Sequence, residues 1–88
     1  MGEFDGKQVT VMGLGRFGGG VGVVRWLVEH GADVVVTDIE QEQDLATSLA
    51  QIRPLVDRGA VTLRLGGHNV SDFTGCDLVV ANPAVPRP

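Results

Sequence analysis

The sequence predicts a single α/β domain built on a parallel β-sheet. Short apolar, β-branched runs alternate with longer segments of helical periodicity, which is typical of parallel strands joined by helical crossovers. The 88 residues, 43% of them hydrophobic and 20% charged, suffice for one small globular core. Six of the 13 glycines fall within positions 13–22, directly after the first apolar run. This placement indicates a tight turn from a strand into a helix.

The first half of the chain predicts a strand, a helix and a second strand. Residues 7–12 are mostly β-branched and apolar, which indicates a buried strand. Residues 21–30 place valines and leucines at helical spacing, and Gly31 follows where glycine commonly ends a helix. Trp26, on this helix, is expected to cover the sheet. The apolar run 34–36 predicts a second buried strand.

The second half predicts one more helix and two more strands. Residues 41–58 carry an apolar stripe, with acidic side chains near the start and basic ones near the end, as the helix dipole favours. Pro54 predicts a kink or an early stop there, because proline lacks the helical N–H. Residues 61–65 alternate apolar and polar side chains, which indicates an edge strand. Residues 77–81 form the last strand, and the continuous apolar run 78–81 predicts a central place in the sheet.

Together these elements predict a Rossmann-like, three-layer α/β domain whose parallel four-stranded sheet has the spatial order 3-2-1-4. We expect residues 1–88 to form this single domain. The proline-rich stretch 82–88 is expected to be irregular and to begin a connection to a further domain.

Charge and composition exclude several classes of function. Seven basic against eleven acidic residues give a net charge of −4, without the basic surface that a nucleic-acid backbone requires. No apolar run approaches the roughly 20 residues of a membrane helix, and the first residues do not resemble a secretory signal. One cysteine allows no internal disulfide, and no Cys/His cluster suggests a metal site. We therefore expect a cytoplasmic protein without nucleic-acid, membrane or metal partners.

The glycine-rich segment carries the functional signal. Gly13 to Gly18 fits the pattern G-x-G-x-x-G, and it lies between a predicted strand and a predicted helix. Such a turn brings backbone N–H groups and a helix N-terminus against a phosphate. Asp38 follows Gly18 by 20 residues, at the end of the second strand. An acidic side chain there is expected to accept hydrogen bonds from a ribose or a base, so nucleotide binding is the leading hypothesis.

Six segments, taken together, resemble the N-terminal domain of the Mur ligases, and within that family the members that add D-glutamate. The resemblance covers essentially the whole chain. The Gly-Gly-His and Asn-Pro-x-x-Pro elements are its specific parts. The segments are Gly6–Val9, Gly13–Gly18, His30–Ala32, Thr37–Asp38, Leu65–His68 and Asp77–Pro86.

The resemblance implies that this domain binds the UDP portion of UDP-N-acetylmuramoyl-L-alanine. It also implies that the chain is a fragment of a three-domain ligase of peptidoglycan synthesis. The central and C-terminal domains of that ligase would bind ATP, with Mg²⁺, and D-glutamate. The 88 residues contain no G-x-x-x-x-G-K-[ST] loop and no catalytic lysine, so we expect no catalytic residue and no catalysis from this chain alone.

Carried over by position, the resemblance also implies a set of UDP-binding residues. Two positions depart from the family pattern. Members often have Ser-Pro-Gly where this chain has Asn-Pro-Ala, and Thr-Arg where it has Ile39-Glu40, so a phosphate-pairing cation is missing. The implied residues are Gly15, Arg16, Phe17, Gly18, Asp38, Ile39, Asn82, Pro83 and Ala84.

A second hypothesis is an NAD-binding regulatory domain of a potassium-uptake system. The glycine pattern and the position of Asp38 suit either protein. A dinucleotide site has no evident need for Gly66-Gly67-His68 or for the Asn-Pro-Ala-Val-Pro ending, and these favour the ligase.

Overall fold

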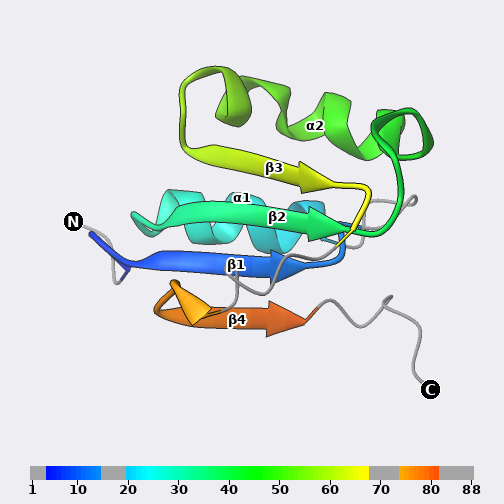
Figure 1. Ribbon diagram of the computed structural model, residues 1–88. Helices are drawn as coiled ribbons and strands as arrows, with labels where there is room; N and C mark the ends of the chain where they lie inside the picture. Colours follow the sequence, from blue (N-terminus) through cyan, green and yellow to red (C-terminus); the bar gives the residue numbers. More distant parts are fainter. Residues whose placement is uncertain (1–3, 15–19, 68–73, 82–88) are drawn as a thin grey trace.

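The computed structural model describes residues 4–14, 20–67 and 74–81. Within these ranges the chain forms four strands and two α-helices, with a short 3₁₀ segment, η1, before the second helix (Figure 1). No helix in these ranges combines the length and the apolar character needed to cross a membrane. In chain order the elements are β1 (Gln8–Met12), α1 (Val21–Glu29), β2 (Asp33–Asp38), η1 (Glu42–Leu45), α2 (Ala46–Asp57), β3 (Val61–Leu65) and β4 (Leu78–Ala81).

The four strands make one parallel sheet in the order β3-β2-β1-β4. One row across the sheet runs from Val61 through Val34 and Val9 to Leu78. The predicted α/β class and strand order are thus confirmed. Because all strands run the same way, their carboxyl ends meet at one edge of the sheet (Figure 1).

The core lies between the sheet and the two helices. Both helices add buried side chains to a single apolar cluster with alternate residues of β1 and β2. The helices are also joined to each other, because Arg25 of α1 donates a hydrogen bond of 2.8 Å to the carbonyl of Gln51 in α2. Residues 68–73, in the connection between β3 and β4, lie outside the described residues, and the predicted third layer stays a prediction.

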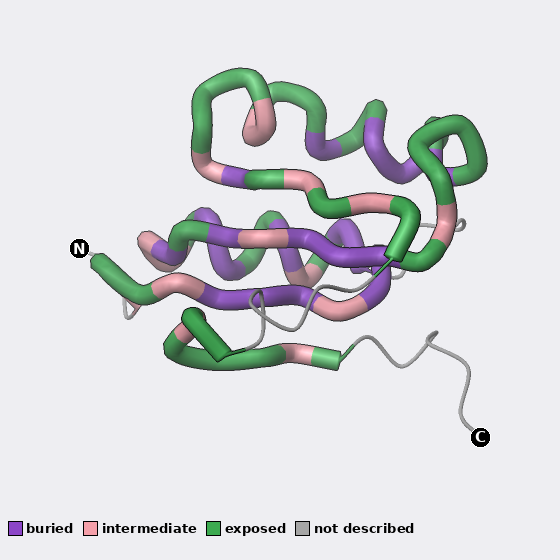
Figure 2. The backbone as a smooth tube through the Cα atoms, viewed as in Figure 1, coloured by how far each residue is buried: buried purple, intermediate pink, exposed green. Residues whose placement is uncertain are grey.

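The central position predicted for residues 78–81 is wrong. β4 lies at the end of the strand order and pairs with β1 alone. Leu78 and Val79 are 43% and 41% exposed, and Figure 2 shows most of β4 as exposed. Only Val80 is partly buried against the core. A run of apolar β-branched residues favours an extended backbone, but it does not determine whether the strand has one neighbour in the sheet or two.

Trp26 does not cover the sheet, contrary to the prediction. Its side chain is 45% exposed and stacks on His30 with ring centroids 4.0 Å apart. Phe4 meets the indole edge to face at 5.6 Å. The buried stripe of α1 contains Val24 and Leu27, and Trp26 points away from that stripe. The three rings therefore form an aromatic cluster at the carboxyl end of α1.

The helix predicted over residues 41–58 is present, with its first turn wound as η1. Pro54 lies inside α2, and the helix continues past it to Asp57, so the predicted early stop does not occur. Gly31 and Gly59 take φ values of 93° and 85° directly after the two helices. This left-handed backbone is the helix ending that glycine permits.

Candidate nucleotide-binding site

The candidate site lies at the carboxyl edge of the sheet, where ligands bind in open parallel α/β folds. Three segments follow the inner strands and β3 at this edge: residues 13–14 after β1, residues 39–41 after β2, and residues 66–67 after β3. We call these segments the strand-end loops. Backbone and side-chain hydrogen bonds connect all three of them.

The residues on either side of positions 15–19 are bonded to each other at the loop after β1. Gly13 has a φ of 94°, and its N–H donates to the carbonyl of Thr37 at 2.7 Å. The N–H of Gly20 donates to the carbonyl of Leu14 at 2.8 Å. A Cβ at Gly20 would lie only 2.8 Å from the carbonyl oxygens of Gly13 and Leu14. Only glycine therefore permits this close approach at position 20.

Helix α1 begins directly after this junction. Gly20 is its N-cap residue, no side-chain cap is found among the described residues, and its first turn has no acidic residue. The amides of a helix N-terminus carry a partial positive charge and can bind an anion. Four of the predicted site residues, Gly15, Arg16, Phe17 and Gly18, lie outside the described residues.

Asp38 connects the three strand-end loops. It ends β2 as predicted, and it is only 7% exposed. Its carboxylate Oδ2 accepts a hydrogen bond of 2.9 Å from the N–H of Leu14, and Oδ1 accepts one of 3.0 Å from the N–H of Glu40. Its backbone carbonyl accepts a third bond, of 3.1 Å, from Gly67. Both carboxylate oxygens thus accept hydrogen bonds from the protein backbone.

The loops after β2 and β3 make further contacts with each other. The N–H of Gly66 donates to the carbonyl of Glu40 at 3.0 Å. The side chain of Gln41 packs so closely that its Nε2 would lie 3.0 Å from a Cβ at Gly66. Ile39, between these contacts, is 61% exposed and presents an apolar side chain at the same edge of the sheet.

Sequence reasoning missed the pairing of Gly66 with Glu40 in the loop after β2 and of Gly67 with Asp38 at the end of β2. The available signal was the double glycine directly after β3, which often marks an unusual backbone. Gly66 takes a φ of 85° and Gly67 one of 156°, so both adopt conformations that favour glycine. The remaining predicted site residues, Asn82, Pro83 and Ala84, lie outside the described residues.

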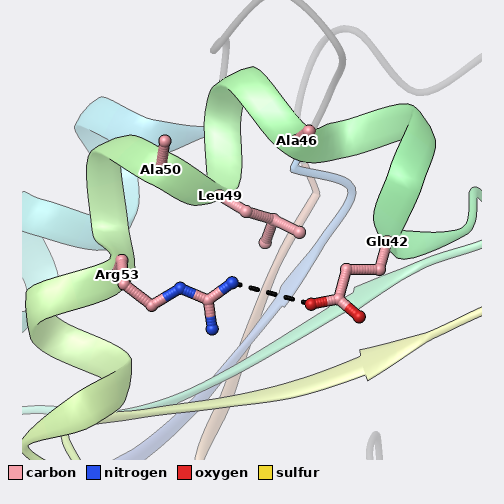
Figure 3. Close-up of a pocket in the computed structure, with 5 residues that line it drawn as sticks. All are labelled: Glu42, Ala46, Leu49, Ala50 and Arg53. Carbon is pink, nitrogen blue, oxygen red and sulfur yellow. Dashed lines mark ion pairs between the residues drawn. The ribbon is translucent and has the colours of Figure 1, made fainter.

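A separate hollow of about 340 Å³ lies on η1 and α2 (Figure 3). Its lining is mainly apolar, and Leu49 forms part of it. The charged groups of Arg53 and Glu42 point toward one another at 3.6 Å, and their side chains are 48% and 68% exposed. This ion pair leaves no net charge to attract a phosphate. The hollow therefore offers weaker support for nucleotide binding than the strand-end loops do.

Comparison with known proteins assigns the whole arrangement to one family. Residues 7–87 match the family described as Mur ligase MurD-like, N-terminal domain. The chain is 47% identical over 84 residues to UDP-N-acetylmuramoylalanine--D-glutamate ligase of Roseiflexus sp., covering 96% of this chain and 17% of that protein. It is 43% identical over 83 residues to the ligase of the same name from Borreliella afzelii, covering 94% of this chain and 18% of that protein.

A third relative with this name, from Anaeromyxobacter dehalogenans, is 46% identical over 84 residues, which are 96% of this chain and 17% of the relative. The chain thus spans less than a fifth of the length of these curated relatives. The matches agree with the Mur ligase resemblance and lend no support to an NAD-binding regulatory domain. The chain belongs to the family of MurD-like Mur ligase N-terminal domains.

Proposed function

We propose that this chain is the UDP-substrate-binding domain of an ATP-dependent ligase that adds D-glutamate to UDP-N-acetylmuramoyl-L-alanine. This reaction would belong to the cytoplasmic stage of peptidoglycan synthesis. Relatives that carry the name of that ligase match nearly the whole chain. The observation that carries the proposal is the junction of three strand-end loops at the N-terminus of α1, connected by Asp38.

The chain would bind the diphosphate with its backbone. Its net charge is −4, so no broad basic surface is available for an anion. The amides of Gly15, Arg16, Phe17 and Gly18, together with the dipole of α1, would supply a local positive potential instead. Arg16 adds the one side-chain cation within the glycine pattern.

The uridine would lie over the loop after β2. The exposed side chain of Ile39 offers an apolar surface to a flat base, while Asp38 fixes the loop beneath it. Asn82, Pro83 and Ala84 follow β4, which ends at Ala81 opposite Met12 of β1. These three residues would close the pocket at the side of β4.

The chemistry would be divided between domains. In the full-length ligase, ATP with Mg²⁺ would supply the phosphoryl group that activates the substrate carboxylate for attack by the amine of D-glutamate. This chain would contribute binding and orientation, which lower the entropic barrier of a reaction between separate molecules. The central and C-terminal domains would provide the remaining sites.

A titration of the domain followed by NMR amide shifts tests the proposal. UDP and UDP-N-acetylmuramoyl-L-alanine should shift the amide signals of Leu14, Gly20 and Glu40, whereas NAD should leave them in place. An Arg16→Ala variant should bind UDP more weakly, and the matched variant Arg53→Ala, whose cation pairs with Glu42, should bind it normally. Shifts with NAD and none with UDP would contradict the proposed function.

A further inference from the structure

A groove of about 290 Å³ lies between α1 and α2, apart from the strand-end loops. Its floor includes the apolar side chains of Val28, which is buried, and Leu55, which is partly buried against the core. The residues that line it come from the second half of each helix. Both helices end where the chain turns back to the start of a strand, so the groove lies toward the amino edge of the sheet (Figure 1). It is thus at the opposite end of the domain from the candidate nucleotide site.

Two arginines, one from each helix, line this groove without a carboxylate partner. Arg25 of α1 donates one hydrogen bond to the carbonyl of Gln51, and Arg58 is the C-cap residue of α2. Within the described residues neither guanidinium group is part of an ion pair, whereas Arg53 on α2 pairs with Glu42 at 3.6 Å. A guanidinium group has five N–H donors in a planar fork that matches a carboxylate. Both arginines therefore keep donors for an acidic partner.

The charge at the groove is opposite in sign to the charge of the whole chain. Two arginines and one glutamate, Glu29, line the groove, while the chain carries a net charge of −4. The dipole of α2 also favours a cation at its carboxyl end, and that interaction leaves the N–H donors of Arg58 open to a further partner. An acidic partner is repelled by most of the surface and attracted here, which favours binding at this one place.

Pro54 gives a second, independent indication that this surface is used. It lines the groove from inside α2, where proline is the least favourable residue because it has no N–H for the carbonyl one turn earlier. The residue is exposed, so core packing does not offset this cost. Residues that break a local folding rule without a gain in stability are expected at functional surfaces.

We propose that this groove docks an acidic amphipathic helix of another protein. The groove is smaller than the roughly 300–1,000 Å³ of small-molecule pockets, so it suits a side chain of a polypeptide. One large apolar side chain of the partner packs against Val28 and Leu55, in the manner of a helix bound in an apolar groove. Carboxylates one turn to either side pair with Arg25 and Arg58. Because the nucleotide site lies at the other edge of the sheet, the partner and a nucleotide bind at the same time.

Three synthetic peptides test the proposal on the unmodified chain. Each is alanine-rich and about 18 residues long, which is enough to form a helix in water. The first carries a leucine with glutamates one turn to either side, the second has lysines in place of the glutamates, and the third has alanine in place of the leucine. Only the first should shift the NMR amide signals of Val28 and Leu55. No shift with the first peptide at millimolar concentration, or equal shifts with either of the others, would overturn the proposal.

Two arginines of the same helix provide a variant and its matched control. Arg58→Ala should weaken binding of the glutamate peptide about threefold, as expected for loss of one exposed ion pair. Arg53→Ala, whose cation is already paired with Glu42, should leave the affinity unchanged. Arg58→Glu should in turn strengthen binding of the lysine peptide. Equal losses in the two alanine variants would overturn the proposal. If the Arg58 variants fail to fold, the salt dependence of the unmodified chain replaces them: binding must weaken between about 0.01 M and about 1 M salt.

Two further titrations separate this proposal from other occupants and from the proposed function. Raising the concentration of the chain alone should leave the signals of Val28 and Leu55 in place. Shifts there would assign the groove to a second copy of the chain and overturn the proposal. UDP should shift Leu14 and Gly20 and leave Val28 in place. A chain that does not respond to UDP would contradict the proposed function, while the peptide result at the groove would stand.

Discussion

Gly20 donates its backbone N–H to the carbonyl of Leu14 at 2.8 Å, so the two ends of the glycine-rich segment are bonded to each other. Asp38 holds the N–H of the same Leu14 at 2.9 Å. Both backbone polar groups of Leu14 are therefore used to place this segment. The stability of this junction and the ability to bind a ligand are expected to change together.

The close approach at Gly20 predicts a large effect of one added methyl group. In Gly20→Ala the Cβ would meet backbone oxygens at 2.8 Å, so the junction must shift, and we expect a loss of about 1–3 kcal/mol in the free energy of unfolding. The matched control is Gly22→Ala in α1, where a Cβ meets nothing within 4 Å. This control should gain about 0.5–1 kcal/mol. Urea unfolding measures both, and equal stabilities of the two variants would contradict the prediction.

The hydrogen bond between the helices predicts a contrast between two arginines. Arg25→Ala removes the donor to the carbonyl of Gln51, and we expect it to lower the free energy of unfolding by about 1 kcal/mol. Arg53→Ala removes only an exposed ion pair with Glu42 and should change it by less than about 0.5 kcal/mol. Thermal unfolding of both variants in the same buffer tests the contrast. A larger loss for Arg53→Ala would show that the ion pair with Glu42 contributes more to stability than the hydrogen bond between Arg25 and Gln51 does.

The position of Pro54 inside α2 predicts that replacing this proline stabilises the domain. Proline has no N–H for the carbonyl of Ala50, one turn earlier, and it is the least favourable residue in a helix interior. We expect Pro54→Ala to raise the free energy of unfolding by about 1 kcal/mol or more, after allowance for the more flexible unfolded chain. Circular dichroism during urea unfolding measures the change. A destabilised variant would mean that the proline ring packs better than alanine does.

The hydrogen bonds of Asp77 predict that its replacement makes the pairing of β4 with β1 less stable locally. Its carboxylate accepts a hydrogen bond of 2.8 Å from the N–H of Gln8, and its own N–H donates to the carbonyl of Gln8 at 2.8 Å. Asp77→Ala removes the first of these bonds at the start of the β1–β4 pairing. Amide hydrogen exchange of Gln8 and Val80 should become faster, with a loss of about 1 kcal/mol in local stability.

Asp33→Ala is the matched control for that experiment. Asp33 faces Gln8 from the other side, in β2, and is exposed. Its replacement should leave the exchange of Val80 unchanged. Faster exchange in the control alone would assign the effect to β2 and not to β4.

Periodicity predicted the strand order but not the surroundings of each strand. The alternation of strands and helices predicts parallel strands joined by right-handed crossovers, and the order of the sheet follows from the Rossmann-like arrangement that this alternation indicates. The exposure of Leu78 and Val79 depends on which segments lie beside β4, and no local pattern contains that information. Trp26 shows a similar limit, because its edge contact with Phe4 involves the chain before β1, even though its stack with His30 lies within one turn of α1.

The sequence predicted where the site residues lie along the strands, but not which hydrogen bonds their side chains and loops make. Spacing placed Asp38 at the end of β2, beside the glycine-rich segment, because strand length and turn residues are local properties. The direction of its carboxylate depends on two backbone N–H groups, of which Leu14 lies 24 positions away in sequence. The pairing of Gly66 with Glu40 likewise arises only when β3 is placed beside β2. The sequence alone does not contain these distances.

The outer side of β4 has a consequence for handling this domain in isolation. Among the described strands it has no further neighbour, and a strand of this kind offers backbone donors and acceptors as a template for another extended chain. The four residues of β4 carry no charge, and the apolar side chains of Leu78 and Val79 are exposed beside that template. Self-association at high concentration is therefore expected to begin along β4.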